Sequence, residues 1–164
     1  MIRPARNDEL AEIGALTVEV YRAERLAPEA YSPNLVDAQG RARHTDLLVA
    51  VDDQDRLVGA VALVLNGGPY AELAISPEDA EFRMLAVSAR ARGRGVGTAL
   101  IEECLARARA AGKRRMVIST GDNMIAAHRR YEALGFGRAP ELDWSPLPEV
   151  NLLAYVLELD SAAD

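Results

Sequence analysis

The chain has 164 residues, of which 49% are hydrophobic and 27% charged, and its net charge at pH 7 is −6. This length and composition are typical of one globular domain with its own core, so we interpret residues 1–164 as a single domain. The acidic balance argues against a nucleic-acid partner, because such binders gain most of their affinity by neutralising phosphates.

Taken in chain order, the N-terminal residues Met1–Arg6 lack the apolar core of a signal peptide. No apolar stretch approaches the roughly 20 residues of a membrane span, so we expect a cytoplasmic protein with no membrane partner. A first helix is predicted over residues 8–25, with Asn7 or Asp8 as its N-cap. Residues 27–43 contain two prolines and predict a loop with a short helix.

The next segments predict an antiparallel hairpin and then alternating strands and helices. Residues 46–51 and 57–65 read as strands joined by a turn at residues 52–55. The expected elements that follow are a strand over 81–87, a helix over 97–111, a strand over 115–120, a helix over 123–134 and a strand over 152–159. Gly112 and Gly135 end the two helices. This order predicts an α/β (α+β) fold, with a mixed, mostly antiparallel sheet flanked by helices.

The single cysteine, Cys104, lies four residues after Leu100 on the apolar face of the helix predicted over 97–111. One cysteine excludes an internal disulfide and a cysteine-based metal cluster. We therefore expect Cys104 to be a small buried hydrophobic residue and not a nucleophile.

Residues 92–97, Arg-Gly-Arg-Gly-Val-Gly, lie between an apolar strand and a helix. The first N–H groups of a helix have no internal partner, and the helix dipole adds about half a positive charge there. Glycines let the backbone approach a phosphate without a Cβ clash. Arg90, Arg92 and Arg94 add positive charge to an otherwise acidic chain. The turn therefore predicts a site for a diphosphate-bearing ligand.

The spacing of this turn narrows the choice of ligand. A dinucleotide fingerprint needs a third glycine where Thr98 or Leu100 stands, and a P-loop needs Gly-Lys, whereas the only lysine is Lys113. The pattern that fits is Arg-x-x-Gly-x-Gly at Arg92, Gly95 and Gly97. It resembles the acetyl-coenzyme A motif of the GCN5-related N-acetyltransferase (GNAT) family.

The resemblance covers most of the chain and is strongest over residues 81–136. It implies acetyl-CoA as co-substrate, no metal, and a strand that splays from its parallel neighbour to admit the pantetheine arm. The coenzyme-binding residues that it implies are Met84, Leu85, Ala86, Val87, Arg92, Gly93, Arg94, Gly95, Val96, Gly97, Thr98, Asn123, Ala126 and Tyr131. A backbone N–H of this strand is expected to polarise the thioester carbonyl. The sequence departs from the family at Ala89, where many members have proline.

Two residues are candidates for catalysis. An alkylamine with a pKa near 10 is protonated at pH 7, so transfer to it requires a base, and the resemblance assigns that role to Glu81. A solvated strand-end glutamate is the alternative, and Glu78 and Asp79 compete for the role. Tyr131 stands four residues before a Gly-Phe pair, as in the family, where such a tyrosine protonates the departing thiolate. Its alternative is a buried aromatic anchor.

Three further residues have two interpretations each. Asn123 either contacts the pantetheine or acceptor, as the resemblance implies, or caps its helix. His128 lies near the coenzyme or, as we expect, is exposed. Trp144, the only tryptophan, lines the acceptor pocket or plugs the structure.

The resulting hypothesis is acetyl transfer from acetyl-CoA to a primary amine on a small molecule or a protein, by direct attack in a ternary complex. Transfer of another acyl group such as succinyl, or a non-catalytic CoA-binding sensor, remains open, and a nucleic-acid module is disfavoured. Pairing into a homodimer is plausible for the family. Carboxylates near the first helix indicate a cationic acceptor, although nearby arginines weaken this; they are Glu19, Glu24, Glu29 and Asp37. Tyr21 and Tyr31 shape the acceptor pocket or pack in the core.

Overall fold

The computed structural model describes residues 1–159, and its sheet is built around the predicted hairpin. Strand β2 (Asp46–Val51) pairs antiparallel with β3 (Leu57–Val64). Successive side chains face opposite sides of the sheet, so that Leu48 joins one hydrophobic cluster and Val49 the other. Strands buried on both faces are continuously apolar, which is why the sequence predicts them clearly.

The full sheet has the strand order β1-β2-β3-β4-β5-β8-β6, and β7 also pairs with β8. The remaining strands are β1 (Ile2–Pro4), β4 (Asp79–Val87), β5 (Arg115–Gly121), β6 (Gly137–Arg138), β7 (Trp144–Leu147) and β8 (Val150–Glu158). Among the described residues, β4 and β5 are the only parallel neighbours. The prediction of a mixed, mostly antiparallel sheet flanked by helices is confirmed.

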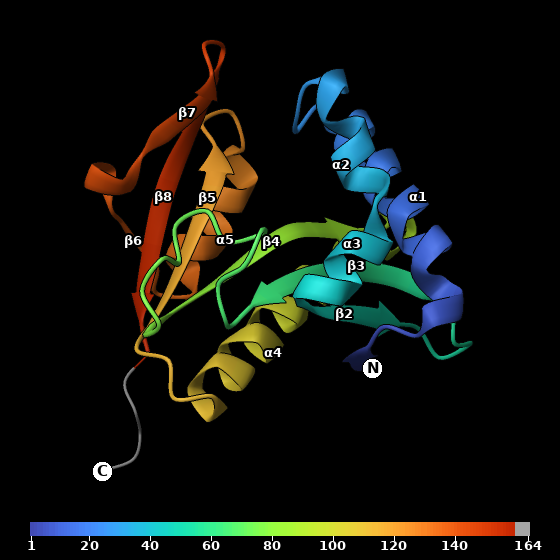
Figure 1. The fold of residues 1–164 in the computed structure, drawn as a ribbon. Helices are drawn as coiled ribbons and strands as arrows, with labels where there is room; N and C mark the ends of the chain where they lie inside the picture. The colour runs from blue at the N-terminus through green and yellow to red at the C-terminus, as the bar shows by residue number, and fades with distance from the viewer. Residues whose placement is uncertain (160–164) are drawn as a thin grey trace.

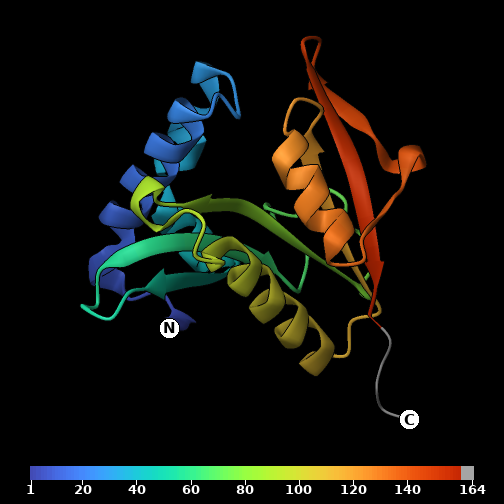
Figure 2. The ribbon, with the colours of Figure 1, turned by 180° about the vertical axis from the view of Figure 1, so that it is seen from behind.

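Helices cover both faces of this sheet (Figures 1 and 2). Helix α4 (Val96–Ala110) packs on one face, where Cys104 is fully buried as expected. Helix α1 (Leu10–Ala23) packs on the other. The remaining helical segments are η1 (Asn7–Glu9), η2 (Glu29–Tyr31), α2 (Ser32–Val36), α3 (Ala38–His44), η3 (Ala89–Ala91), α5 (Ile125–Ala133) and η4 (Pro140–Leu142).

Several local predictions are wrong. Neither Asn7 nor Asp8 caps the first helix, because the chain enters it through the 3-10 turn η1, and no side-chain hydrogen bond forms at either N-cap position. Of the two interpretations of Asn123, the helix cap is excluded, because the N-cap position of α5 belongs to Met124. His128 is buried rather than exposed, and its Nε2 lies 2.8 Å from the carbonyl oxygen of Gly121.

Strands β4 and β5 pair only where they begin. Their parallel register joins Asp79–Glu81 to Arg115–Val117, and beyond these residues the two strands diverge (Figure 1). Strand β4 also contains a β-bulge, because Ala60 pairs with Ala86 whereas Ala62 pairs with Arg83. Met84 in the bulge has a φ of +55°. The sheet therefore opens immediately after Glu81.

Candidate active site

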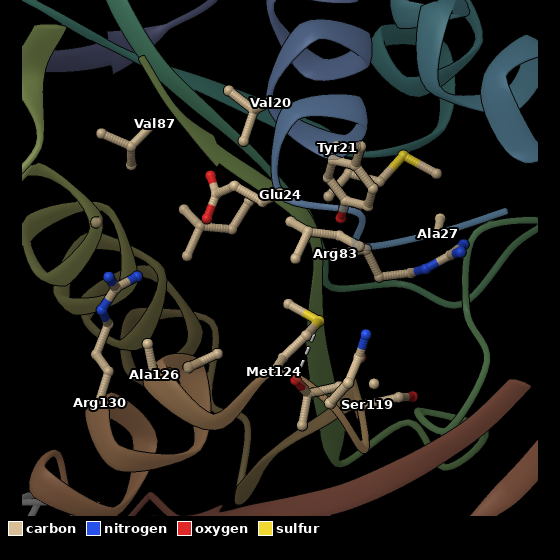
Figure 3. A pocket seen from close by; sticks show the side chains of 18 of the residues that line it. Val20, Tyr21, Glu24, Ala27, Arg83, Val87, Ser119, Met124, Ala126 and Arg130 are labelled. Atoms are coloured by element: carbon tan, nitrogen blue, oxygen red, sulfur yellow. Dashed lines mark hydrogen bonds between the residues drawn. The ribbon is translucent and has the colours of Figure 1, made fainter. Parts of the chain in front are cut away.

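A pocket of about 940 Å³ lies between the diverging strands β4 and β5. All but two of the predicted site residues line it (Figure 3). They are Glu81, Met84, Leu85, Val87, Arg92, Gly93, Gly95, Val96, Gly97, Thr98, Asn123, Ala126 and Tyr131. Of the other two, Ala86 is buried in the cluster beneath α1, and Arg94 is exposed outside the pocket.

The glycine turn forms one end of the pocket. Gly93 and Gly95 both have a φ of +76°, a left-handed conformation that side chains rarely adopt. Gly95 is the N-cap residue of α4, with no side-chain cap, and a Cβ on it would meet no atom within 4 Å. The N–H groups of the first helical turn therefore have no capping side chain, as an anion site requires.

The three arginines that the sequence places around this turn have different partners. Arg92 lines the pocket and forms an ion pair with Glu24, the residue after α1, at an Nη2–Oε2 distance of 2.6 Å. Arg90 donates to the carbonyl oxygen of Leu57 at 2.7 Å and does not line the pocket. Of the three predicted cations, only Arg92 is therefore at the pocket.

A fourth arginine, which the sequence analysis does not identify, lies beside the turn. Arg130 extends from α5 toward the start of α4 (Figure 3). A Cβ built on Gly97 would lie 2.7 Å from its Nη1 atom, so the guanidinium occupies the space that glycine leaves open. Arg92 and Arg130 together add two positive charges to the helix N-terminus.

Glu81 is fully buried, which rules out the interpretation as a solvated strand-end residue. Its Oε1 accepts hydrogen bonds from the backbone N–H groups of Glu72, Leu73 and Ala74 at 2.8, 3.0 and 3.2 Å. Its Oε2 is also buried but has no hydrogen-bond partner among the described residues. Burial raises the pKa of the Glu81 carboxyl, and the three N–H bonds lower it by less. Such a group is a candidate proton acceptor.

The two competing carboxylates do not line the pocket. Glu78 is exposed and lies 3.5 Å from Arg114. Asp79 is buried and accepts two hydrogen bonds from the guanidinium of Arg115, at 3.0 and 3.1 Å. The side chain of Glu81 is therefore the better placed of the three.

Tyr131 lies on α5 and is 6% exposed, with its ring packed against Phe82, Phe136 and Tyr155. Burial raises the pKa of its phenol to about 12, so the hydroxyl stays protonated at neutral pH. Tyr131 is thus a buried aromatic anchor that also lines the pocket with a protonated hydroxyl, so burial does not exclude it as a candidate proton donor.

The opposite end of the pocket from Arg130 is formed by α1, η2 and the loop before β4 (Figure 3). Arg83 on β4 donates to the hydroxyl of Tyr31 at 2.7 Å and to the carbonyl oxygen of Tyr70 at 3.2 Å. It also forms an ion pair with Glu72 at 3.1 Å. Burial raises the pKa of the phenols of Tyr21 and Tyr31, which both line this end.

Of the four carboxylates near the first helix that indicated a cationic acceptor, only Glu24 lines the pocket. Glu29 pairs with Arg22, Asp37 caps α3 by accepting from the N–H of Gly40, and Glu19 is exposed outside the pocket. Trp144 does not line the pocket either; its Nε1 donates to the hydroxyl of Ser119, which does line it, at 3.4 Å.

Within residues 1–159, no helix is long and apolar enough to cross a membrane. No group of three or more His, Cys, Asp or Glu residues in the same range is arranged to hold a metal ion.

Comparison with known proteins identifies the fold and the family. Over 97% of both chains, the structure matches a GCN5-related N-acetyltransferase from Kribbella flavida, with a TM-score of 0.73 and 26% identity. A GNAT-family acetyltransferase from Staphylococcus aureus gives a TM-score of 0.77 at 15% identity, over 98% of this chain and 99% of that chain. The yncA protein of Salmonella typhimurium, solved with its cofactor acetyl-CoA, gives 0.71 at 20% identity, over 98% and 94%. The fold is therefore that of an acetyltransferase.

The sequence comparisons agree. The model of the acetyltransferase (GNAT) family matches residues 12–136. An uncharacterized N-acetyltransferase of Schizosaccharomyces pombe is 30% identical over 107 residues, which are 65% of this chain and 61% of that relative. The match thus spans less than two thirds of the relative's length. The chain belongs to the GNAT family.

The sequence does not single out Arg83, Arg130 or Glu72 as site residues, and it does not indicate that Glu24 pairs with Arg92. Arg83 follows Glu81 by two residues, so strand alternation alone places both side chains on one face of β4. Arg130 directly precedes the predicted Tyr131 in the same helix. The ion-pair partners Glu24 and Glu72 have no comparable signal, because each lies in a separate segment from the arginine that it contacts.

Proposed function

We propose that the protein transfers an acetyl group from acetyl-CoA to a primary amine. The observation that carries this proposal is the unpartnered Oε2 atom of Glu81, in a pocket whose other end is a glycine-capped helix N-terminus. A base and an anion site in one pocket are what an amine acceptor and a diphosphate-bearing donor require.

The residues present fit the coenzyme. Open space faces Gly93 and Gly95, and the first N–H groups of α4 together with Arg92 and Arg130 would hold the pyrophosphate. Residues Met84 to Val87 follow the point where β4 leaves β5, so their backbone groups would pair with the pantetheine arm. Asn123 and Ala126 line the same gap from the α5 side.

The chemistry needs two protons removed from the acceptor ammonium and one supplied to the departing sulfur. Glu81 accepts the first proton of the ammonium, directly or through water, since a free amine is required for attack. The amine nitrogen then bonds to the acetyl carbon while the thioester C–S bond breaks, and the Tyr131 phenol donates a proton to the departing sulfur. The second proton then leaves the nitrogen and restores the phenol, which yields the neutral amide and the CoA thiol. Attack is direct, because Cys104 is fully buried outside the pocket and no other cysteine is present.

The test is release of the CoA thiol from acetyl-CoA in the presence of a library of amines, with mass spectrometry of the products. The proposal predicts thiol release that matches the acetylated amine mole for mole, and its loss in Glu81→Gln. Binding of acetyl-CoA without transfer to any amine would instead support a coenzyme sensor. Faster transfer from succinyl-CoA would correct the acyl group while leaving the reaction class intact.

A further inference from the structure

Few charged side chains line the end of the pocket away from the glycine turn. Among the described residues, the whole pocket is lined by the carboxylates of Glu24, Glu72 and Glu81 and by the guanidinium groups of Arg83, Arg92 and Arg130. Arg92, its partner Glu24, and Arg130 lie at the turn, where the proposed function places the coenzyme pyrophosphate. The acceptor end is therefore left with Glu72, Glu81 and Arg83, which is an excess of one carboxylate.

Two of these carboxylates are already paired. Glu72 lies 3.1 Å from Arg83, which is also held by the hydroxyl of Tyr31. Glu24 lies 2.6 Å from Arg92 at the glycine turn. Among the described residues, Glu81 is the pocket carboxylate that forms no ion pair, and its buried Oε2 atom accepts no hydrogen bond. One ammonium group of an acceptor can thus pair with Glu81, whereas a second ammonium group would lose its hydration without gaining a carboxylate partner.

Apolar and aromatic side chains line much of the end away from the turn. Tyr21, Leu26 and Pro28 line it from the α1–η2 segment, and Pro146 and Leu147 line it from the β7–β8 hairpin. Leu147 is 46% exposed, so an apolar surface is available to an incoming molecule. Such a wall gains free energy by covering an apolar group and none by covering a hydrated, charged one.

We infer that the acceptor is a monoamine on an apolar or aromatic body, and not a polyamine or an aminoglycoside. This inference rests on the proposed acetyl transfer. The single ammonium meets Glu81, and the apolar body lies between the α1–η2 segment and the β7–β8 hairpin.

The test compares kcat/KM for hexylamine and phenethylamine with kcat/KM for spermidine and kanamycin, using the wild-type enzyme and acetyl-CoA. We expect the monoamines to be favoured at least about tenfold, the effect of roughly one misplaced group in an apolar pocket. Equal or faster transfer to the polycations overturns the inference but supports the proposed function. No transfer to any amine by a protein that binds acetyl-CoA overturns the proposed function, and the inference with it.

Two variants test whether the β7–β8 hairpin is the part of the pocket that selects the acceptor. Leu147→Glu should lower kcat/KM for phenethylamine roughly tenfold, raise it for spermidine, and leave the Kd of acetyl-CoA unchanged. Val36→Glu is the matched control, because Val36 is 54% exposed on α2 and does not line the pocket. We expect it to leave the ranking of amines unaltered. An unaltered ranking in Leu147→Glu would show that the hairpin does not contact the acceptor and would overturn the inferred position.

Discussion

Replacing Glu81 by glutamine separates the proposed chemical role of this residue from its structural one. Glutamine keeps an Oε1 atom that can accept the N–H bonds of Glu72, Leu73 and Ala74, but it cannot accept a proton. We therefore expect Glu81→Gln to fold with a free energy of unfolding within about 1 kcal/mol of the wild type. Its kcat/KM at pH 7 should fall about 10²- to 10⁴-fold, the usual contribution of a general base.

Replacement of Glu81 by alanine provides the structural reference. Alanine leaves three backbone N–H groups without their acceptor, and each costs about 1 kcal/mol or more when it is unsatisfied. Thermal or urea unfolding of Glu81→Ala should therefore show a loss of about 3 kcal/mol. A similar loss in Glu81→Gln would show that the carboxylate charge is needed to hold the loop before β4.

The pH dependence of the Glu81→Gln variant tests both claims. An alkylamine loses its own proton near pH 10, so the activity deficit of Glu81→Gln should shrink as the pH approaches that value. A deficit that is constant with pH, or none at all, would refute the role as base.

The stability of the two proteins should also diverge with pH. The folded-state pKa of Glu81 is raised above its unfolded value. Its contribution to stability is therefore present below the unfolded pKa and is lost as the pH rises through the folded pKa. Glutamine does not ionise, so Glu81→Gln should gain stability relative to the wild type over that window. Thermal unfolding measured across the acidic to neutral range would show the opposite trend if the N–H bonds outweighed burial.

Three other changes test the pocket. Gly95→Ala and Gly112→Ala both place a side chain at a φ of +76° with nothing within 4 Å, so unfolding should show an equal loss of about 1–2 kcal/mol. Calorimetry should show that only Gly95→Ala weakens acetyl-CoA binding, by about tenfold or more. Equal Kd values for the two variants would show that the pyrophosphate does not bind at the glycine turn. Tyr131→Phe should lower kcat about 10²-fold with little change in the Kd of acetyl-CoA. Because the pKa of Tyr131 is about 12, its role as acid would be contradicted by a wild-type rate that declines with rising pH before about pH 10 is reached. Glu24→Gln frees Arg92 from an exposed ion pair worth about 0.2–1 kcal/mol and should tighten acetyl-CoA binding up to about fivefold; weaker binding would oppose this.

The elements that the sequence predicts well are those with local causes. The hairpin of β2 and β3 is continuously apolar, and the glycine turn and Tyr131 belong to short motifs within one strand-helix unit. Their burial and their conformation follow from neighbouring residues. The predicted bounds of these elements therefore differ from the observed ones by only one or two residues.

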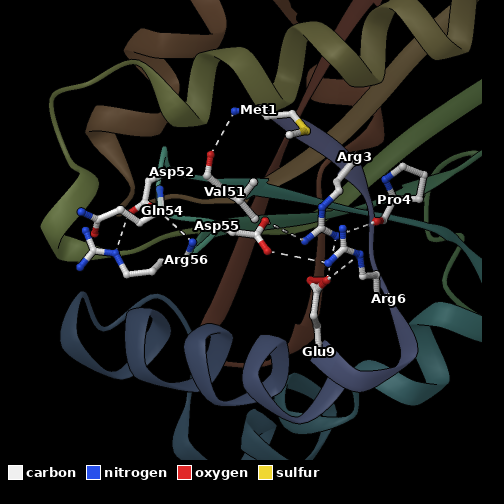
Figure 4. A network of polar contacts seen from close by, with 10 residues as sticks. All are labelled: Met1, Arg3, Pro4, Arg6, Glu9, Val51, Asp52, Gln54, Asp55 and Arg56. Carbon is white, nitrogen blue, oxygen red and sulfur yellow. Dashed lines mark hydrogen bonds and ion pairs between the residues drawn. The ribbon is translucent and has the colours of Figure 1, made fainter.

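Strand β1 is missed because contacts distant in sequence hold its three residues in place. The backbone N–H of Val51 donates to the carbonyl oxygen of Met1 at 2.9 Å. Arg3 forms an ion pair with Glu9 at 2.8 Å and lies 3.8 Å from Asp55, in the turn between β2 and β3 (Figure 4). No periodicity within three residues signals such an arrangement.

Strand β7 is missed for a different reason. Its sequence contains Pro146, which cannot donate a hydrogen bond and is typical of loops. Pairing with β8 nevertheless holds Trp144 opposite Leu152 and Leu147 opposite Val150, with an irregular register between them. A proline is tolerated at such an edge position. The strand thus depends on its partner rather than on its own sequence.

Two of the contacts that hold the pocket arginines are likewise long-range. The ion pair of Arg92 and Glu24 joins residues 68 apart, and the hydrogen bond from Arg83 to Tyr31 joins residues 52 apart. The sequence therefore predicts which segments form the pocket. It does not predict that the carboxylates in the pocket wall are paired, which is the basis for the inferred acceptor.

The most direct test of the central claim is calorimetric titration of the wild-type protein with acetyl-CoA, with NAD and ATP as controls. We expect acetyl-CoA to bind at one site per chain and the two nucleotides to bind far more weakly. Absence of acetyl-CoA binding, or a preference for either nucleotide, would contradict the assignment of the glycine turn and of the pocket beside it.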